Sequence, residues 1–571
     1  MSKPIYVLGT GLSHDGSSCL LKDGEIIVAI EKERLTRIKH DGGNDTDTVQ
    51  YCLNTAGIKV SDLSLVVQSA NFEKDEIKKD NYRGKRLFEA STDIPFVSIS
   101  HHLAHAWSAV GRSPFNECNI MIIDGCGSFY SQCDDLTDVC IPNDIGSQPG
   151  IYAEKDSFYF FDGKNLLPIF KDFSVIGGMH QAGVARLPIT AHSIGGLYAM
   201  AANYCFGSYD DAGKLMGLAP YGRKNIYTDP LFILQDGRVW VNEVSIQKHF
   251  VSPADEVVHP FNEHFQYYAD IARWVQEEAE KAIRYIFENR LSLHPHAQIC
   301  YAGGVALNAV ANTRILLESN IEQFYIEPAA GDNGLALGCA YYGWIQILQK
   351  EKIPAKGNTL LGKVYNKKEI DVAVQNMLSS PAGKNIQCEE MGNYIEETAR
   401  ILDTGKCIAW FQLGSEFGPR ALGRRSILAD PRIPDIQDTI NHDIKLREDF
   451  RPFAPAVLYE DKNLYFELGL ESQYMILIDR IKDQWKDTMP GIVHVDGTCR
   501  VQTVKETEEP FYQLLKAWKS RSGISVLLNT SFNKKGMPIV ETPEEATSFF
   551  INSKLDVLVL HNYIISKLSP C

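Results

Sequence analysis

Short apolar runs separated by Gly, Asp and Ser loops mark the first part of the chain. The run PIYVLG leads into TGLSHDGSS, and a Lys-Asp-Gly turn then separates two further apolar runs. The same pattern returns at NIMIIDGCGS and, after a polar insertion near 133–150, at DSFYFFDGKNLLPIFKDF. Apolar runs of roughly four to eight residues between turn residues are typical of β-strands. The repeat predicts a duplicated α/β domain whose two polar loops face each other across a cleft.

The rest of the chain alternates between predicted strands and helices. QICYAGGVALN has the pattern of a strand, a Gly-Gly turn and the start of a helix. A polar stretch rich in Lys, Pro and Gly predicts a linker at 351–366, which separates a domain at 1–350 from a second α/β domain at 367–571. In the second domain we expect a helix near 390–405, the strands KCIAWFQ and SVLLNTSF, and one terminal strand, DVLVLHNYII.

The polar loops of the duplicated domain suit phosphate binding. Small residues let backbone N–H groups approach phosphate oxygens, and an Asp in such a loop can hold a cation. This is the arrangement of the actin, sugar-kinase and chaperone ATPase fold. The turn at Gly303 and Gly304 would bring a helix N-terminus to a nucleotide. Alone it is an ordinary strand–helix connection, but beside duplicated phosphate loops nucleotide binding is the better interpretation.

Composition narrows the class of partner. The 571 residues are 44% hydrophobic and 23% charged, as in ordinary globular proteins, and the formal net charge is −15. An acidic balance disfavours a nucleic-acid partner. No apolar run reaches the roughly 18 residues that span a bilayer, and the N-terminus has no long apolar stretch of a signal peptide. The 13 cysteines include no CxxC pair, so we expect reduced thiols, no zinc finger and a cytoplasmic location.

Two histidines suggest a metal site. His101 and His105 in SISHHLAHAW are four residues apart, so on a helix both imidazoles face the same way. Asp124 follows the strand NIMII, and Asp332 lies in EPAAGDNG before a small-residue helix. Two imidazoles with carboxylates suit a divalent transition metal such as iron(II), and ligand type alone leaves zinc and manganese open. The alternative is that the histidines are ordinary helix residues and Asp124 only caps a turn.

Basic residues gather in Gly- and Pro-rich segments of the second domain. A guanidinium group can donate two parallel hydrogen bonds to the oxygens of one phosphate or carboxylate group. Apolar neighbours such as Phe417, Phe450 and Phe453 favour a pocket wall over a solvated charged face. Asn529 and Ser531 in NTSFN add an amide and a hydroxyl at a strand end. The basic residues are Arg420, Arg424, Arg425, Lys445, Arg447, Arg451 and Arg500.

Two further residues are candidates for proton transfer or substrate contact. His14 lies in the first polar loop, where an imidazole could accept or pass on a proton. Lys39 lies in EKERLTRIKH, on a predicted solvent-facing turn. Without other information, Lys39 would be interpreted as an ordinary surface lysine.

Ordered motifs along nearly the whole chain resemble the ATP-dependent O-carbamoyltransferases, which modify nodulation factors, antibiotics and related natural products. The motifs are SHDGSS, KERLTRIKH, HHLAHA, IDGCGS, GKLMGLAPYG, AGGVALN, AAGDNG, FGPRALGRRSIL, KLREDFRPFAP, DGTCRVQTV and NTSFN. The resemblance implies an N-terminal domain with a duplicated actin/sugar-kinase-like ATPase fold (Kae1-like), similar to the enzyme that makes threonylcarbamoyl-adenosine in tRNA. It implies a C-terminal α/β domain that is YrdC-like, similar to that enzyme's adenylate-forming partner.

The resemblance also implies a reaction and a set of residues. Carbamoyl phosphate and ATP, with Mg²⁺, would form carbamoyl-adenylate in the C-terminal domain, and the N-terminal domain would transfer the carbamoyl group to a hydroxyl of a small polar acceptor. His14 and Lys39 would lie beside the transferring group, and Gly303, Gly304 and Asn308 would contact the nucleotide. Matched positions imply His101, His105, Asp124 and Asp332 as ligands of iron(II), with zinc or manganese as alternatives, and Arg420, Lys445, Arg451, Arg500, Asn529 and Ser531 as ligands of carbamoyl phosphate and ATP.

Other classes fit less of the sequence. A sugar kinase or chaperone ATPase would not need the histidine pair or the arginine-rich domain. A tRNA threonylcarbamoyl-transferase would be expected to have a basic surface, whereas the sequence pI is about 5.5. A hydrogenase-maturation carbamoyltransferase would carry CxxC motifs, and a binding module would not retain every chemical group. No pattern identifies the acceptor, and the resemblance makes a homodimer plausible.

Overall fold

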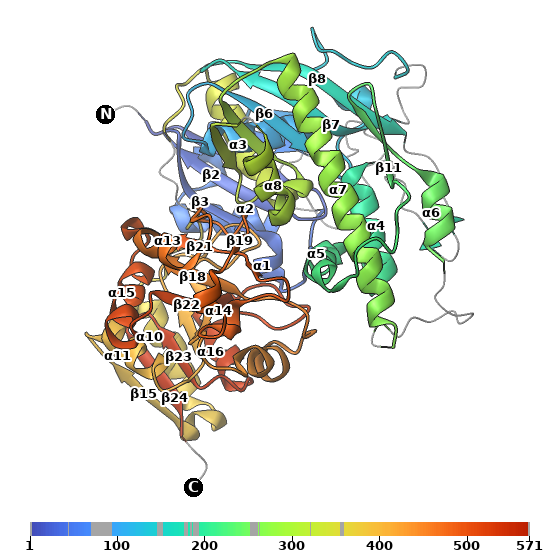
Figure 1. The fold of residues 1–571 in the computed structure, drawn as a ribbon. Coiled ribbons are helices and arrows are strands. Elements are labelled where there is room, and N and C mark those ends of the chain that lie inside the picture. Colours follow the sequence, from blue (N-terminus) through green and yellow to red (C-terminus); the bar gives the residue numbers. More distant parts are fainter. Residues whose placement is uncertain are drawn as a thin grey trace. The chain divides into compact units, whose positions relative to one another are not determined.

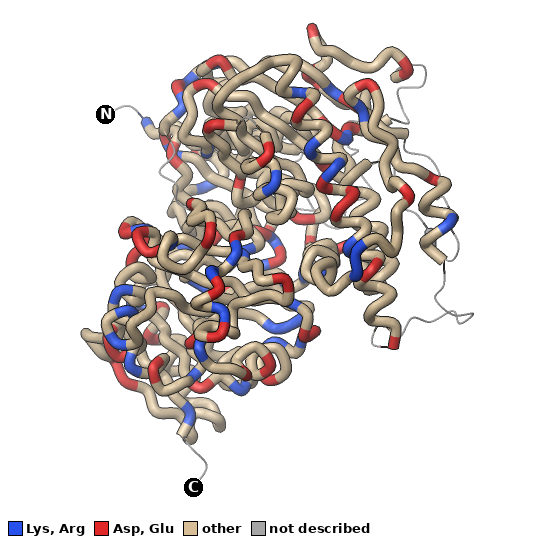
Figure 2. Tube along the Cα trace, in the orientation of Figure 1, with Lys and Arg blue, Asp and Glu red and all other residues tan. Residues whose placement is uncertain are grey.

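The computed structural model of the chain forms two compact units. The first unit comprises Met1–Lys32 and His40–Asn358, and the second comprises Glu33–Lys39 and Thr359–Cys571. The structure describes residues 3–43, 45–69, 94–145, 152–175, 181–182, 185–186, 193–251, 261, 263–319, 321–354 and 359–568. Parts of the predicted linker and of the insertion near 133–150 therefore lie outside the described residues. Acidic and basic residues are interspersed through the described parts of both units (Figure 2).

The first sheet of unit 1 contains the first copy of the sequence repeat. Its five strands have the order β3-β2-β1-β4-β5. The first three strands pair antiparallel, and β4 and β5 extend the sheet parallel to β1. The bounds are β1 Tyr6–Gly11, β2 Ser17–Lys22, β3 Glu25–Glu31, β4 Leu65–Ser69 and β5 Phe96–Ile99.

The second sheet of unit 1 repeats this topology. Its order is β8-β7-β6-β13-β14, with β6, β7 and β8 antiparallel and β13 and β14 parallel to β6. Each copy thus places its first strand at the centre of the sheet, and the polar loop follows that strand. The predicted duplicated α/β domain is confirmed (Figure 1). The bounds are β6 Cys118–Ile123, β7 Tyr152–Phe161, β8 Leu166–Val175, β13 Gln298–Ala302 and β14 Gln323–Ile326.

Two helices connect the sheets of unit 1. Helix α3 (His101–Arg112) packs on β6, β7 and β13, helix α9 (Leu335–Tyr341) packs on β1, β2 and β4, and the two helices pack on each other. Their backbones approach closely at Gly338, where an added Cβ would lie 1.7 Å from the carbonyl oxygen of Ala104. A residue with a side chain therefore cannot occupy position 338 without separating the helices.

The remaining named elements of unit 1 surround this core. Helix α7 is the longest of the described helices and contacts α4, α5 and α8. The bounds are α2 Thr46–Ala56, α4 Ile194–Phe206, α5 Ala212–Leu218, α6 Glu243–His249, α7 Phe265–Leu293, α8 Ala309–Glu318, β9 Gln181–Ala182, β10 Ala185–Arg186, β11 Phe232–Gln235 and β12 Arg238–Val241.

Unit 2 is built on one mixed sheet of eight strands. Its order is β15-β24-β23-β16-β17-β22-β18-β21, and a large apolar core with Trp410 and Trp518 lies between the sheet and its helices. The strands are β15 Ile386–Glu390, β16 Ile408–Phe411, β17 Arg425–Ala429, β18 Ala454–Leu458, β21 Gln502–Val504, β22 Val526–Ser531, β23 Val557–Leu560 and β24 Tyr563–Lys567, and a separate pair is β19 Asp479–Arg480 and β20 Thr498–Cys499. The helices are α10 Lys367–Ser379, α11 Tyr394–Leu402, α12 Ile436–Asp438, α13 Lys462–Tyr465, α14 Asp483–Lys486, α15 Phe511–Ser522 and α16 Pro543–Ile551.

The prediction of a single terminal strand in unit 2 is wrong. The run DVLVLHNYII is not a single strand but the antiparallel hairpin of β23 and β24. The chain reverses at His561, which has a φ of 55°, and at Asn562. Apolar residues on both sides of the turn concealed it, because the connection has no Gly or Pro.

A short segment from the N-terminal part of the chain belongs to unit 2. Helix α1 (Lys32–Thr36) begins at the unit boundary, and Glu33–Lys39 groups with unit 2. The fully buried Arg34 donates to the carbonyl of Gly418 at 2.9 Å, and Arg37 donates to the carbonyls of Pro538 and Ile539 at 2.7 and 2.8 Å. No hydrophobic pattern predicted this segment's position, because polar contacts to backbone carbonyls hold it.

None of the helices in the described part of the chain combines the length and the apolar character that crossing a bilayer requires.

Candidate functional site

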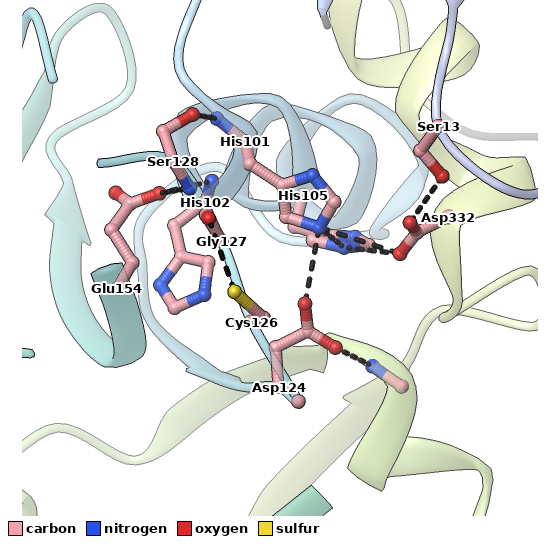
Figure 3. A network of polar contacts seen from close by, with 12 residues as sticks. Ser13, His101, His102, His105, Asp124, Cys126, Gly127, Ser128, Glu154 and Asp332 are labelled. Carbon is pink, nitrogen blue, oxygen red and sulfur yellow. Dashed lines mark hydrogen bonds and ion pairs between the residues drawn. The ribbon is translucent and has the colours of Figure 1, made fainter. Parts of the chain in front are cut away.

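The four predicted metal ligands lie together in unit 1. His101 and His105 occupy adjacent turns of α3, and Asp124 is the first residue after β6. Asp332 begins the short 3-10 turn Asp332–Gly334 that leads into α9. All four side chains are buried, and one donor atom of each lies within 4.8 Å of the others. Helix α3 thus brings the histidines to the point where the loops after β6 and β14 meet (Figure 3).

The donor atoms form a small cage. The Nε2 atoms of His101 and His105 are 3.1 Å apart. Nε2 of His101 is 3.0 Å from Oδ2 of Asp124 and 3.3 Å from Oδ1 of Asp332, and Nε2 of His105 is 3.6 Å from the same Asp332 oxygen. Four ligands of a tetrahedral metal at about 2.0–2.1 Å would be about 3.3–3.4 Å apart. The cage therefore has the size of a divalent-metal site.

Hydrogen bonding alone does not account for these contacts. A ring nitrogen carries at most one hydrogen, yet Nε2 of His101 faces three polar atoms at 3.0–3.3 Å. The Nδ1 atoms of His101 and His105 are buried and have no hydrogen-bond partner within the described part of the chain. A cation between the four donors would contact all of them at once, so the residues present fit a bound metal.

The second oxygen of each carboxylate is held by a neighbouring loop. Oδ1 of Asp124 accepts a hydrogen bond from the backbone N–H of Gly304 at 2.9 Å, and Oδ2 of Asp332 accepts one from the hydroxyl of Ser13. Such partners orient a metal-binding carboxylate. Gly304 and Ser13 therefore connect the cage to the Gly-Gly turn and to the first polar loop.

The cluster binds protons tightly when no cation is present. Burial lowers the pKa of His101, but the carboxylates of Asp332 and Asp124 outweigh it and raise the pKa to about 10. The pKa of Asp332 stays well below its usual value because His101 and His14 offset burial. A divalent metal bound here would replace the proton on His101, so its binding would release a proton from this cluster.

His14 lies at the edge of the cage, in the loop between β1 and β2. Its Nε2 is 3.4 Å from Oδ2 of Asp332 and its Nδ1 is 3.2 Å from Asp15, which also pairs with His40 at 2.8 Å. Desolvation lowers the pKa of His14, but Asp332 and Asp15 raise it to about 10. The side chain is 66% exposed and therefore accessible from solvent.

The Gly-Gly turn is where its sequence predicted, after β13. Gly303 has a φ of 93°, and an added Cβ would lie 2.3 Å from the carbonyl oxygen of Ile123. The side chain of Asn308 caps α8 by accepting from the N–H of Ala311 at 3.1 Å and also pairs with Gln276. These contacts give Asn308 a structural role, so a nucleotide contact by its side chain would require exchanging one of them.

A cluster of cationic side chains lies in unit 2. Burial and the charge of Arg451 lower the pKa of Arg420 to about 10 and that of Arg447 to about 9. Burial and the neighbouring arginines hold the pKa of Arg500 well below its usual value. Burial, with Arg447, Arg451 and Lys39, lowers the pKa of Lys445 in the same way. A polyanion bound among these side chains would offset both their desolvation and their mutual repulsion.

Lys445 is held in place by the NTSFN motif. Its ammonium donates to the carbonyl of Ser531 at 2.5 Å, to the Ser531 hydroxyl at 3.0 Å and to Oδ1 of Asn533 at 2.7 Å. Three acceptors match the three protons of a charged ammonium. Asn533 was missed in the sequence analysis, although it belongs to the quoted motif; it also accepts from the Ser531 hydroxyl at 2.7 Å.

Buried polar groups shape the loop that carries Arg420. One oxygen of Glu416 accepts from the N–H groups of Leu422 and Arg424, both at 2.7 Å. The amide of Asn529 donates to the carbonyl of Ala421 at 3.2 Å and to Oε1 of Gln502 at 2.8 Å. The amide of Gln502 donates to the carbonyl of Leu422 at 3.0 Å. Asn529 thus supports the loop, while its Oδ1 is buried without a hydrogen-bond partner among the described residues. Neither Glu416 nor Gln502 was predicted.

Three other predicted cations have different surroundings. Arg425 is fully buried, stacks on Phe411 at 3.5 Å and donates to the carbonyl of Gln412. Arg424 is buried near Glu416 and Glu508, so both arginines belong to the core of unit 2. Lys39 is exposed and belongs to unit 2, where its charge acts on Lys445.

Comparison with known proteins identifies the family. The carbamoyltransferase N-terminus model matches residues 7–92 and 63–341, and the carbamoyltransferase C-terminus model matches 399–567. Nodulation protein NolNO of Sinorhizobium fredii is 31% identical, with 97% of this chain and 79% of that protein covered. Nodulation protein NolO of Bradyrhizobium diazoefficiens is 30% identical, with 82% and 79% covered. The chain therefore belongs to the carbamoyltransferase family.

A more distant likeness exists among solved structures. A crystal structure of HypF from T. kodakarensis is 13% identical and has a TM-score of 0.37, covering 61% of this chain and 49% of that chain. A likeness this distant supports no functional statement.

Proposed function

We propose that the protein is an ATP- and carbamoyl-phosphate-dependent O-carbamoyltransferase. Carbamoyl phosphate, ATP and water give carbamoyl-adenylate, phosphate and pyrophosphate at unit 2, and unit 1 transfers the carbamoyl group to an acceptor hydroxyl. The observation that carries the proposal is the partly buried cluster of cationic side chains in unit 2, in a chain of the carbamoyltransferase family. The cluster comprises Arg420, Lys445, Arg447, Arg451 and Arg500, of which Lys445 is buried.

The cation cluster suits the first step. Carbamoyl phosphate and the triphosphate of ATP with Mg²⁺ are both polyanions, and their charge offsets the repulsion among the cations. Arg420 and Arg500 orient the phosphate groups, while Lys445 and Ser531 lie on the rim formed by the NTSFN motif. The carbonyl of a carbamate is a poor electrophile because the nitrogen donates its lone pair to it. Attachment of the carbamate to AMP supplies a leaving group for the transfer step.

The metal centre suits the second step. When bound, a divalent metal acts as a Lewis acid that polarises the carbamoyl oxygen. The acceptor hydroxyl attacks the carbamoyl carbon, the bond to AMP breaks, and the hydroxyl proton passes to a base. His14 is the candidate base because its exposed imidazole adjoins Asp332. Without a cation its pKa is raised to about 10, and a divalent metal bound to Asp332 would lower that pKa and leave the ring free to accept the proton. Two histidines and two carboxylates suit iron(II), with zinc and manganese as alternatives.

The acceptor is proposed as a small polar molecule with a free hydroxyl group. The segments predicted to contact it, near 130–150 and 170–190, lie partly outside the described residues. The homodimer and the cytoplasmic location stay predictions.

The first test is pyrophosphate release from ATP by the purified protein, with and without carbamoyl phosphate and without acceptor. The proposal expects release of pyrophosphate that depends on carbamoyl phosphate. Release of ADP and phosphate, or no response to carbamoyl phosphate, would instead favour a kinase-like ATPase. Carbamoylation dependent on threonine and tRNA would favour a tRNA threonylcarbamoyl-type transferase.

A further inference from the structure

A buried carboxylate next to the metal centre has no role in the proposed reaction. Glu154 lies on β7, is fully buried, and is not one of the four metal ligands. Figure 3 shows its carboxylate directed at the start of α3 and at the loop that follows Asp124. The stretch of sequence around Glu154, IYAEKDSF, has no feature that indicates a functional residue.

Glu154 joins the two elements that carry metal ligands. Its Oε2 accepts from the backbone N–H of His102 at 3.2 Å and from the backbone N–H of Ser128 at 2.9 Å. The hydroxyl of Ser128 in turn accepts from the N–H of His101 at 2.9 Å. One carboxylate therefore fixes the first turn of α3 relative to the loop from Asp124 to Ser128.

Backbone contacts make this connection stiff. The N–H of Gly127 donates to the carbonyl of Glu154 at 2.8 Å, and the N–H of Glu154 donates to the carbonyl of Ser128 at 3.0 Å. A Cβ added at Gly127 would lie 2.6 Å from Oε2 of Glu154 and 2.7 Å from Cδ2 of His102. The loop thus lies directly against the carboxylate, with no space for a side chain.

A buried cation balances the charge of Glu154. Nζ of Lys171 lies 2.6 Å from Oε1 of Glu154 and 2.6 Å from Oδ1 of Asp135. Burial raises the pKa of Glu154, but Lys171 and His102 lower it to about 2 overall, so the carboxylate is ionised at neutral pH. Both oxygens are therefore committed, one to the lysine and one to the two N–H groups.

We propose that Glu154 is a positioning residue of the metal centre, which holds His101 and Asp124 at the separation that a divalent metal requires. Each of these ligands lies at an end of its element, His101 at the start of α3 and Asp124 after β6. The N–H of Asp124 donates to the carbonyl of Lys155 on β7 at 3.0 Å, and Glu154, next to Lys155, adds a side-chain connection from the same strand to His102 and Ser128. The inference rests on the metal centre of the proposed function, but not on carbamoyl transfer.

The test compares metal affinity in two matched variants of the full chain. Glu154→Gln replaces the carboxylate by an amide, whose NH₂ group must face either Lys171 or the two N–H donors. Asp156→Asn is the control, because Asp156 is also a buried β7 carboxylate, paired with Arg290 at 2.6 Å and outside the cage. Metal-free protein is titrated with Co²⁺, and the visible absorption bands report both affinity and coordination.

The expected result is a loss of Co²⁺ affinity of about 10- to 100-fold in Glu154→Gln, with changed absorption bands, and a loss of less than about threefold in Asp156→Asn. Equal losses in both variants, or unchanged affinity and bands in Glu154→Gln, would overturn the proposal. If Glu154→Gln does not fold, Ser128→Ala provides the second variant. It removes the acceptor of the His101 N–H and should lower affinity by about tenfold or less with changed bands, whereas wild-type affinity and bands would overturn the proposal.

The outcome is separable from that of the proposed function. No Co²⁺ binding by the wild-type protein would overturn the metal centre and the role of Glu154 together. Pyrophosphate release that depends on carbamoyl phosphate tests the reaction of unit 2 in a separate assay.

Discussion

His101 is the residue on which the metal cage depends most. Its Nε2 is within 3.3 Å of His105, Asp124 and Asp332. Replacing His101 leaves one imidazole and two carboxylates in the cage, so a cation would be bound more weakly. Its four-residue spacing from His105 was readable in the sequence because helical periodicity puts both rings on one face.

We expect His101→Ala to abolish metal binding and carbamoyl transfer while leaving pyrophosphate release near the wild-type rate. The physical reason is that the cation cluster of unit 2 contains no residue of the cage. The assay measures pyrophosphate release with carbamoyl phosphate, alongside metal content. His294→Ala is a suitable control, because His294 pairs with Asn119 outside the cage. Loss of pyrophosphate release in His101→Ala, with His294→Ala unaffected, would contradict the division of the reaction between the units.

Glu508 gives a residue-scale prediction for pH. Burial outweighs the N–H of Lys505 and the charge of Arg424 and raises the pKa of Glu508 from 4.5 to about 7. Between these values the folded state binds more protons than the unfolded state, so the free energy of unfolding falls as pH rises through this window. Urea unfolding at about pH 5 and about pH 8 should show a smaller difference in Glu508→Gln than in the wild type. An identical difference in both proteins would show that Glu508 does not titrate in this range.

At the scale of elements, the contact between α3 and α9 determines where the metal ligands meet. Asp332 begins the short turn that leads into α9, and His101 and His105 lie on α3, so the helix spacing sets the ligand spacing. Strand and helix positions were largely predictable from periodicity, including both copies of the repeat. The close approach of the helices was not predictable, because GLALGCAY could pack at many distances before its partner is known.

We expect Gly338→Ala to lower the free energy of unfolding by about 1–3 kcal/mol or more, because its Cβ would overlap the Ala104 carbonyl oxygen. Urea unfolding monitors the change. The control is Gly213→Ala in α5, where an added Cβ meets nothing within 4 Å. That variant should be neutral or more stable by up to about 1 kcal/mol, since Ala favours a helix over Gly. Similar destabilisation in both would point to a general intolerance of substitution.

At the scale of the whole molecule, chain order and unit membership do not coincide. The segment Glu33–Lys39 is separated from the rest of unit 2 by more than three hundred residues of sequence, yet it belongs to unit 2. Arg34 supports the carbonyl of Gly418, in the loop that Glu416 also holds. The loop that carries Arg420 is therefore held in part by a segment from the start of the chain.

We expect Arg34→Ala to increase amide hydrogen exchange in residues 416–425, because Gly418 loses a buried donor. Hydrogen exchange followed by mass spectrometry measures the effect segment by segment. Lys39→Ala is the control in the same segment, since Lys39 is exposed. Unchanged exchange in 416–425 for Arg34→Ala would show that the loop does not depend on the segment.

The sequence by itself determined the duplicated α/β pattern, the helix that carries the histidine pair, and the residue types of both candidate sites. These follow from local periodicity and from motifs whose residues are close together along the chain. Only the tertiary structure decided that Arg424 and Arg425 are core residues and that Glu154, Glu416 and Gln502 hold the loops of the two sites. These depend on contacts between residues far apart in sequence and on the hydrogen bonds that buried polar groups require, and no local pattern specifies either.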